Sequence, residues 1–276
     1  MTERWTEITK AVVLARGLGT RMRREDPSAT LDEAQQAAAA AGVKAMIPIG
    51  RPFLDYALSA LADAGCREVC LVIGPEHTDI RDYYTRRAPP ERVRVAFAEQ
   101  PEPRGTADAL LAAEAFAAGD RVLMVNSDNY YPAAALAALR RVPGSGLLGF
   151  EREALVRESN IEPERVLRYA LLAVRPDGTL ARIVEKPDDA TARAFGDLAL
   201  VSMNAWAFTP AIYEACRRVT PSARGELELQ DAVRIAIDEM GERFTVVPVA
   251  AGVLDLSSRS DIAAVRERLA GVEAHP

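Results

Sequence analysis

The chain has 276 residues, enough for one large α/β domain or for one domain with a small appendage. Its 49% hydrophobic residues include no apolar run near the roughly 18 to 20 residues that cross a bilayer, and its formal net charge of −6 argues against general nucleic-acid binding. The charged N-terminus lacks the apolar core of a signal peptide, and the three cysteines predict no disulfide framework. We therefore expect a cytoplasmic protein with no membrane or nucleic-acid partner.

The first half of the chain alternates short apolar runs with segments of helical periodicity. The apolar runs are rich in valine and predict parallel strands covered on both faces, at 10–15, 67–74, 92–99 and 121–126. The segments between them carry apolar residues at helical spacing, at 52–65, 78–87 and 106–119. This alternation predicts βαβ units and a doubly wound sheet.

The second half of the chain shows a different pattern of predicted elements. Residues 165–187 predict two strands joined by a turn at 176–179, and residues 198–208 predict a further strand. The remaining elements are helices near 210–219 and 226–240, two short strands within 244–256, and a closing helix over 259–271. Because we find no internal repeat and no low-complexity linker, we predict a single continuous domain over residues 1–276.

One segment interrupts this order. Residues 27–44, PSATLDEAQQAAAAAGVK, contain an alanine-rich stretch with high helix propensity. Two interpretations stay open for the inserted part, about 27–42: a surface helix, or a mobile lid over the loop that precedes it.

That preceding loop follows the first strand in the stretch AVVLARGLGTRMRRED, residues 11–26, which holds two glycines and four arginines. A P-loop would need Gly-Lys-Ser/Thr after a four-residue gap, and a dinucleotide fingerprint would need a small residue where Met22 stands. The remaining possibility is a glycine-rich loop that wraps around a nucleoside triphosphate. Loop N–H groups then face the phosphate oxygens, and Arg21 neutralises their charge.

The sequence LARGLGTRM resembles the signature loop of the sugar-1-phosphate nucleotidyltransferases. Further blocks resemble the same family in the same order and together cover most of the chain: VKAMIPIGRPFLDYALSALADAG, EQPEPRGTADAL, LMVNSDNYY, IVEKP and GVLDLSSRSDIAAV. The resemblance implies a Rossmann-like three-layer α/β/α fold with a mostly parallel mixed sheet. It also implies a nucleotide-binding half at about 8–150 and a sugar-phosphate-binding half at about 151–276.

The resemblance assigns roles to residues by their place in these blocks. It implies catalytic cations at Arg21, Lys44 and Lys186, and magnesium ligands at Asp128 and Asp255. It implies contacts to the sugar phosphate from Glu185, Lys186 and Asn204. It implies nucleotide contacts from Ala15, Gly17, Gly19, Thr20, Gln100, Gly105 and Thr106, with Gln100 and the Gly105 backbone at the edge of the base.

The implied reaction joins a nucleoside triphosphate to a sugar 1-phosphate and releases pyrophosphate. A phosphate oxygen of the sugar attacks the α-phosphorus in line, so no side-chain nucleophile or base is needed, and cations with Mg²⁺ offset the repulsion of two polyanions. The residue content agrees with a reaction that needs no side-chain base, because the chain has two histidines and neither lies in a motif. The base, the sugar and the stoichiometry of any homo-oligomer stay open.

Some residues depart from the family pattern or allow a simpler interpretation. Arg16 stands at a glycine position, so either it adds a cation near the phosphates or it reshapes the loop. We expect Arg21, together with Arg16 or Arg23, to face the leaving pyrophosphate. The acidic cluster at Glu226, Glu228 and Asp231 suits a helix start, although the family that the chain resembles also has an acidic block here. Two alternative functions are transfer to another phosphorylated acceptor, such as phosphocholine, and a regulator that binds nucleotide sugars without turnover.

Overall fold

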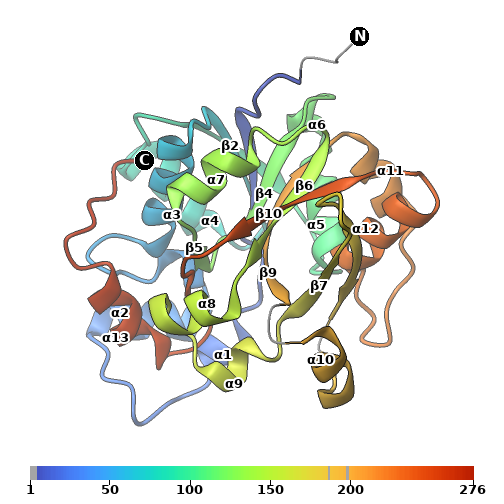
Figure 1. Cartoon of the computed structure of the whole chain (residues 1–276). Coiled ribbons are helices and arrows are strands. Elements are labelled where there is room, and N and C mark those ends of the chain that lie inside the picture. Colours follow the sequence, from blue (N-terminus) through green and yellow to red (C-terminus); the bar gives the residue numbers. More distant parts are fainter. Residues whose placement is uncertain (1–4, 186, 197–198) are drawn as a thin grey trace.

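The computed structural model describes residues 5–185, 187–196 and 199–276. A large mixed sheet forms its centre (Figure 1), with the strand order β10-β6-β9-β4-β1-β2-β3 and with β7 pairing with β8 and β9. The strands of this sheet are β1 (Lys10–Leu14), β2 (Glu68–Ile73), β3 (Arg94–Glu99), β4 (Val122–Asn126), β6 (Ser145–Phe150), β7 (Ala170–Val174), β8 (Leu180–Val184), β9 (Leu200–Phe208) and β10 (Phe244–Val249). A separate two-stranded ladder pairs β5 (Asn129–Tyr130) with β11 (Leu254–Asp255).

Helices cover both faces of the sheet. The first-half helical elements are α1 (Thr20–Arg23), α2 (Glu33–Ala41), η1 (Lys44–Met46), α3 (Phe53–Ala64), α4 (Thr78–Asp82), the π-turn η2 (Tyr83–Arg87), α5 (Thr106–Ala112), α6 (Glu114–Ala117) and α7 (Ala133–Leu139). The second-half helices are α8 (Arg152–Glu158), α9 (Pro163–Val166), α10 (Asp189–Phe195), α11 (Ala211–Arg217), α12 (Leu229–Asp238) and α13 (Asp261–Arg268). Across the described residues, no helix has both the length and the apolar character that a membrane span requires.

The core has two layers because strand side chains alternate between faces. Ala11 and Val13 of β1 pack into the cluster under α3 and α7, while Val12 between them packs into the cluster under α5, α11 and α12. Figure 1 shows these two helix sets on opposite sides of the sheet. The near-continuous apolar strands of the first half are therefore explained by burial on both faces, and the predicted three-layer α/β/α fold is confirmed.

Two predicted helices differ in detail from their predicted ranges. The helix expected over 106–119 breaks into α5 and α6, with Ala118 in the left-handed region at φ 52°. The helix expected over 78–87 ends in the wider turn η2. The three cysteines are buried free thiols, and burial raises the pKa of Cys66 to about 11.

The sequence reasoning missed strand β6, which lies between β9 and β10. Its sequence SGLLGF contains Gly146 and Gly149, and glycine normally weakens a strand. Here both glycines are required by packing, since a Cβ on Gly149 would lie 2.9 Å from methyl groups of Leu200 and Val246.

Candidate active site

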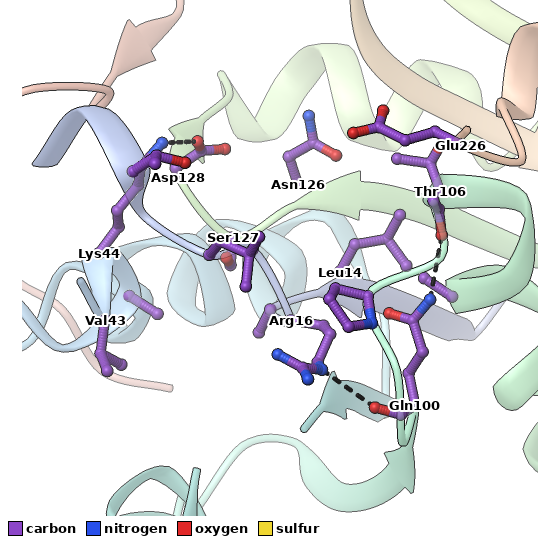
Figure 2. A pocket seen from close by; sticks show the side chains of 18 residues that line it. Leu14, Arg16, Val43, Lys44, Gln100, Thr106, Asn126, Ser127, Asp128 and Glu226 are labelled. Carbon is purple, nitrogen blue, oxygen red and sulfur yellow. Dashed lines mark hydrogen bonds and ion pairs between the residues drawn. The ribbon is translucent and has the colours of Figure 1, made fainter. Parts of the chain in front are cut away.

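A cavity lies where the order of the parallel strands reverses. β1 pairs in parallel with β2 on one side and with β4 on the other, so the chain winds outward from β1 to β3 and then returns across β1. Crevices at the carboxyl ends of strands at such a point bind ligands in open α/β sheets. A cavity of about 350 Å³ occupies this place, and residues that follow β1, β3 and β4 line it (Figure 2).

The cavity brings together residues from four blocks of the sequence resemblance. Eight of the predicted site residues line it: Ala15, Gly17, Thr20, Lys44, Gln100, Gly105, Thr106 and Asp128. Gly19 and Arg21 adjoin it in the same loop and in α1, whereas Asp255, Glu185 and Asn204 are not part of its lining.

The glycine-rich loop owes its shape to a close backbone contact. Gly19 has φ 60°, a left-handed conformation, and a Cβ at this position would overlap the Gly42 carbonyl. Gly42 is also left-handed at φ 74°, and its carbonyl accepts a hydrogen bond of 3.1 Å from the Lys44 N–H. The loop, the end of α2 and the start of η1 therefore hold one another in place.

Lys44 and Asp128 form an ion pair in the cavity wall. Their Nζ and Oδ2 atoms are 2.9 Å apart, and the Asp128 side chain is 25% exposed. Asp128 comes just after β4, where Ser127 N–H donates to the Leu14 carbonyl and so continues the sheet. Figure 2 shows the pair across the cavity from Gln100. The site thus presents one cation and one carboxylate at the same point.

Asp255 lies beside Asp128 but in a different environment. It faces Asn129 in the β5–β11 ladder and is 7% exposed. One carboxylate oxygen is paired with Arg165, and the other accepts a hydrogen bond of 3.2 Å from the Asn129 amide. Burial and then the Asp128 charge raise the pKa of Asp255, and the Arg165 guanidinium opposes them.

Arg21 belongs to the same electrostatic neighbourhood, although its side chain is exposed. Burial, and next the Asp255 carboxylate, raise the pKa of Tyr169, while the charges of Arg165 and Arg21 oppose that shift. Arg21 is therefore within electrostatic reach of the Tyr169 hydroxyl, beside the two carboxylates. Of the predicted cations and acids, Lys44 and Asp128 line the cavity, Asp255 lies beside Asp128, and Arg21 is close enough to Tyr169 to affect its pKa.

The opposite side of the cavity carries the predicted base-reading residues. Gln100 is 2% exposed, and its Nε2 donates to the Gly105 carbonyl at 3.1 Å and to Asp108 at 2.8 Å. Gly105 has φ 124°, and a Cβ there would overlap the Leu227 backbone. Only glycine allows this approach, so the edge of the pocket depends on it.

Arg16 does not face the phosphate side, contrary to one of our expectations. Its guanidinium donates to the Gln100 carbonyl at 3.0 Å and pairs with Glu76 at 2.5 Å. Arg23 also turns away, because its Nη2 donates to the Ala41 carbonyl at the end of α2. In both cases a backbone carbonyl far along the chain captures the guanidinium, and local sequence does not reveal that contact.

The predicted sugar-phosphate residues lie toward the second half of the chain. Glu185 follows β8 and is exposed, and its charge acts on the guanidinium of Arg224. Asn204 has φ 59° within β9, and its side-chain oxygen accepts from Gln230 at 3.3 Å. Lys186 lies outside the described residues. The structure therefore leaves the sugar-phosphate assignments as predictions.

Sequence reasoning assigned no site role to several residues that shape this region. Glu226 lines the cavity, although its acidic block was explained by the start of α12. Arg165 bridges Asp255 and Asp261 from α9, an element that was not predicted. No local motif marks a lone arginine that pairs with acids about 90 residues away.

The alanine-rich segment forms α2, as predicted. Asp32 and Gln35 make a capping box at its start, and the Gln35 side chain donates to the Pro48 carbonyl at 3.0 Å. Ala39 is fully buried in a small apolar cluster with Met22 and residues of α13. These contacts support the surface-helix interpretation, and the lid stays an untested alternative.

Comparisons with known proteins agree with this geometry. The family model described as nucleotidyl transferase matches residues 10–265. The UTP–glucose-1-phosphate uridylyltransferase of Haloferax volcanii is 28% identical over 261 residues, which cover 94% of this chain and 96% of that protein. A glucose-1-phosphate thymidylyltransferase of Streptomyces antibioticus is 32% identical over 233 residues, covering 83% of this chain and 57% of that protein.

A solved structure supports the fold. A UDP-glucose pyrophosphorylase complexed with UDP-glucose superimposes with a TM-score of 0.74 at 19% identity, covering 96% of this chain and 100% of that chain. At this identity the likeness concerns the fold alone. The family match, which spans most of the sequence, decides the identification. The chain belongs to the nucleotidyl transferase family, and its resemblance to the sugar-1-phosphate members of that family is confirmed.

Proposed function

We propose that this chain transfers a nucleotidyl group from a pyrimidine nucleoside triphosphate, UTP or dTTP, to a hexose 1-phosphate and releases pyrophosphate. The observation that carries the proposal is the meeting of the glycine-rich loop, the Lys44–Asp128 pair and Gln100 around one cavity. The relatives named above are sugar-1-phosphate enzymes, which supports this function over the choline-phosphate and regulator alternatives.

The arrangement suits a reaction between two polyanions. The triphosphate lies along the Gly17–Thr20 loop, where main-chain N–H groups and the cation of Arg21 offset its charge. Lys44 lies at the reacting end beside Asp128 and balances charge on the transferring phosphate. The attacking phosphate is already ionised, so positioning and charge balance supply the catalysis.

Asp128 fits a magnesium site. Its carboxylate is partly exposed in the cavity wall, and oxygen is the ligand type that Mg²⁺ prefers, commonly one or two carboxylates with water and phosphate oxygens. When bound, the ion would stabilise negative charge on the reacting phosphates. Asp255 fits less directly, because Arg165 and Asn129 already hold both of its oxygens. We propose Asp128 as the direct ligand and Asp255 as its neighbouring support.

The experiment that tests this function measures pyrophosphate release. The four ribonucleoside triphosphates and dTTP are each combined with glucose 1-phosphate, galactose 1-phosphate, mannose 1-phosphate and phosphocholine. We expect turnover with UTP or dTTP and a hexose 1-phosphate, loss of turnover in excess chelator, and recovery when Mg²⁺ is restored. Turnover with phosphocholine alone, or nucleotide-sugar binding without turnover, would contradict the proposal.

A further inference from the structure

The Arg16 side chain lies inside the wall of the base end of the cavity. It is 8% exposed, and its three nitrogen atoms all donate: Nε to the Gln100 carbonyl at 3.0 Å, Nη2 to the Pro101 carbonyl at 3.4 Å, and Nη1 to Glu76. Figure 2 shows the guanidinium turned toward Gln100 and away from Lys44 and Asp128. The partners of this charge are therefore two backbone carbonyls and the Glu76 carboxylate.

The chain makes room for this guanidinium at Gly74, just after β2. A Cβ on Gly74 would lie 2.6 Å from the Nε and Cζ atoms of Arg16. Glu76, two residues on, supplies the counter-charge at 2.5 Å. Two separate segments, one with Gly74 and Glu76 and one with Gln100 and Pro101, therefore accommodate one arginine, and a solvated surface charge would need neither of them.

The carbonyls that Arg16 holds begin the loop 100–105, which lies between β3 and α5. The same loop is fixed at its other end, because Leu227 N–H donates to the Arg104 carbonyl at 2.7 Å and Ala107 N–H donates to the Leu227 carbonyl at 2.9 Å. The Gln100 side chain crosses between the two ends to Gly105. Arg16 is thus the anchor at the start of the loop that lines the base end.

We propose that Arg16 is a positioning residue for recognition of the base, acting through the main chain at Gln100 and Pro101. This inference rests on the proposed function, which places the base at this end of the cavity. The guanidinium fixes where the Gln100 amide and the Gly105 backbone stand, and so determines how tightly and how selectively the loop binds a nucleobase. A guanidinium can donate to two carbonyls and a carboxylate at the same time, which suits this role. A lysine at the same position could replace only part of these hydrogen bonds.

The test measures equilibrium binding of UTP, dTTP, CTP and GTP, and separately of inorganic pyrophosphate, to the full chain. The variants are Arg16→Ala, Arg16→Lys and the milder Glu76→Gln. The matched control is Arg140→Ala: Arg140 is 7% exposed, its Nε donates to the Ile8 carbonyl at 2.7 Å, and it pairs with Glu7 at 2.7 Å. Arg140 is remote from the cavity, so it reports the loss of a buried arginine alone.

We expect Arg16→Ala to weaken binding of the preferred nucleotide about tenfold, as the loss of charged hydrogen bonds implies, while pyrophosphate affinity stays within about twofold. Discrimination among the four nucleotides should narrow, Arg16→Lys should restore part of the loss, and Glu76→Gln should show the same pattern more weakly. In turnover, the KM for the nucleotide should rise without a matching change in the KM for the sugar phosphate. Arg140→Ala should lower the melting temperature and leave nucleotide affinity unchanged.

Three results would overturn the inference. Equal loss of nucleotide and pyrophosphate affinity would place Arg16 on the phosphates. Lower stability of Arg16→Ala and Glu76→Gln, with wild-type affinity and selectivity, would leave Arg16 a purely structural role. A wild-type chain that binds none of the nucleotides would instead refute the proposed function, and the inference with it.

Discussion

The two ends of the cavity are built on different principles. At the base end, Arg16, Gln100 and Leu227 bond to the protein itself, so their polar groups already have partners. At the phosphate end, Lys44 and Asp128 have one another, and Arg21 is exposed on α1. The proposed base end is therefore held by internal hydrogen bonds before any ligand binds, whereas the proposed phosphate end presents charged side chains that a bound ligand would draw into new contacts. We therefore expect residues of the base end to determine selectivity for the nucleobase, and residues of the phosphate end to determine the rate of turnover.

The largest effect that would test this division is at Asp128. Asp128→Asn keeps the shape of the side chain but removes the negative charge, so we expect kcat to fall about 1,000-fold through loss of the metal ligand. The control is Asp120→Asn, since Asp120 forms a similar pair with Lys10 at 2.7 Å just before β4. Both variants should melt within a few degrees of the wild type. Near-normal turnover of Asp128→Asn would end the metal assignment.

The next effect concerns the rigidity of the base end. Gly105→Ala forces a Cβ into the Leu227 backbone at φ 124°, and we expect a loss of about 3 kcal/mol of unfolding free energy together with a raised KM for the nucleotide. Gly119→Ala is the control, because φ is 82° there and the space around the glycine is open, so strain alone should cost about 1 kcal/mol. Urea denaturation and initial rates measure both. Equal losses for the two variants would mean that the Leu227 contact contributes nothing.

A smaller effect separates the two carboxylates at the phosphate end. Asp255 already has Arg165 and Asn129 as partners, so Asp255→Asn should lower kcat by about tenfold and leave the Mg²⁺ concentration for half-maximal rate unchanged. Asp128→Asn should raise that concentration. The measurement is a Mg²⁺ titration of pyrophosphate release. If Asp255→Asn raised the half-maximal concentration as much, Asp255 would be a direct ligand.

The smallest effect is a pH dependence beside Arg16. His77 Nδ1 accepts a hydrogen bond of 3.1 Å from the Gly74 N–H, and burial, opposed by Glu76, lowers the pKa of His77 below 6.5. The unfolded chain therefore takes up the proton first, so the stability from neutral His77 is complete above pH 6.5 and is lost as the pH falls through the lowered pKa. His77→Asn should flatten this loss in urea denaturation at about pH 7.5 and about pH 5.5. The exposed His275→Asn should leave the slope unchanged, and an equal change in both would refute the assignment to His77.

Local patterns predicted the frame of the cavity well. The valine-rich strands that became β1 to β4, and the glycines after β1, follow from burial and loop geometry that act within a few residues. Strand β6 was missed because tertiary packing requires its glycines: Gly149, for example, packs against Leu200 and Val246, which are distant in sequence. The partners of Arg16 and Asp255 were missed for the same reason. A guanidinium can pair with any carbonyl or carboxylate that the fold brings near it. Residue spacing along the chain therefore does not predict which partner an arginine will have.

The contact between Gly19 and Gly42 ties the alanine-rich segment to the phosphate loop. Because the Gly42 carbonyl touches Gly19 and also accepts the Lys44 N–H, a shift at the end of α2 must move the loop and Lys44 together. A displacement of α2 would thus be transmitted to the proposed phosphate subsite. A random screen for altered pyrophosphate inhibition should consequently return substitutions along α2, on residues that touch no reactant.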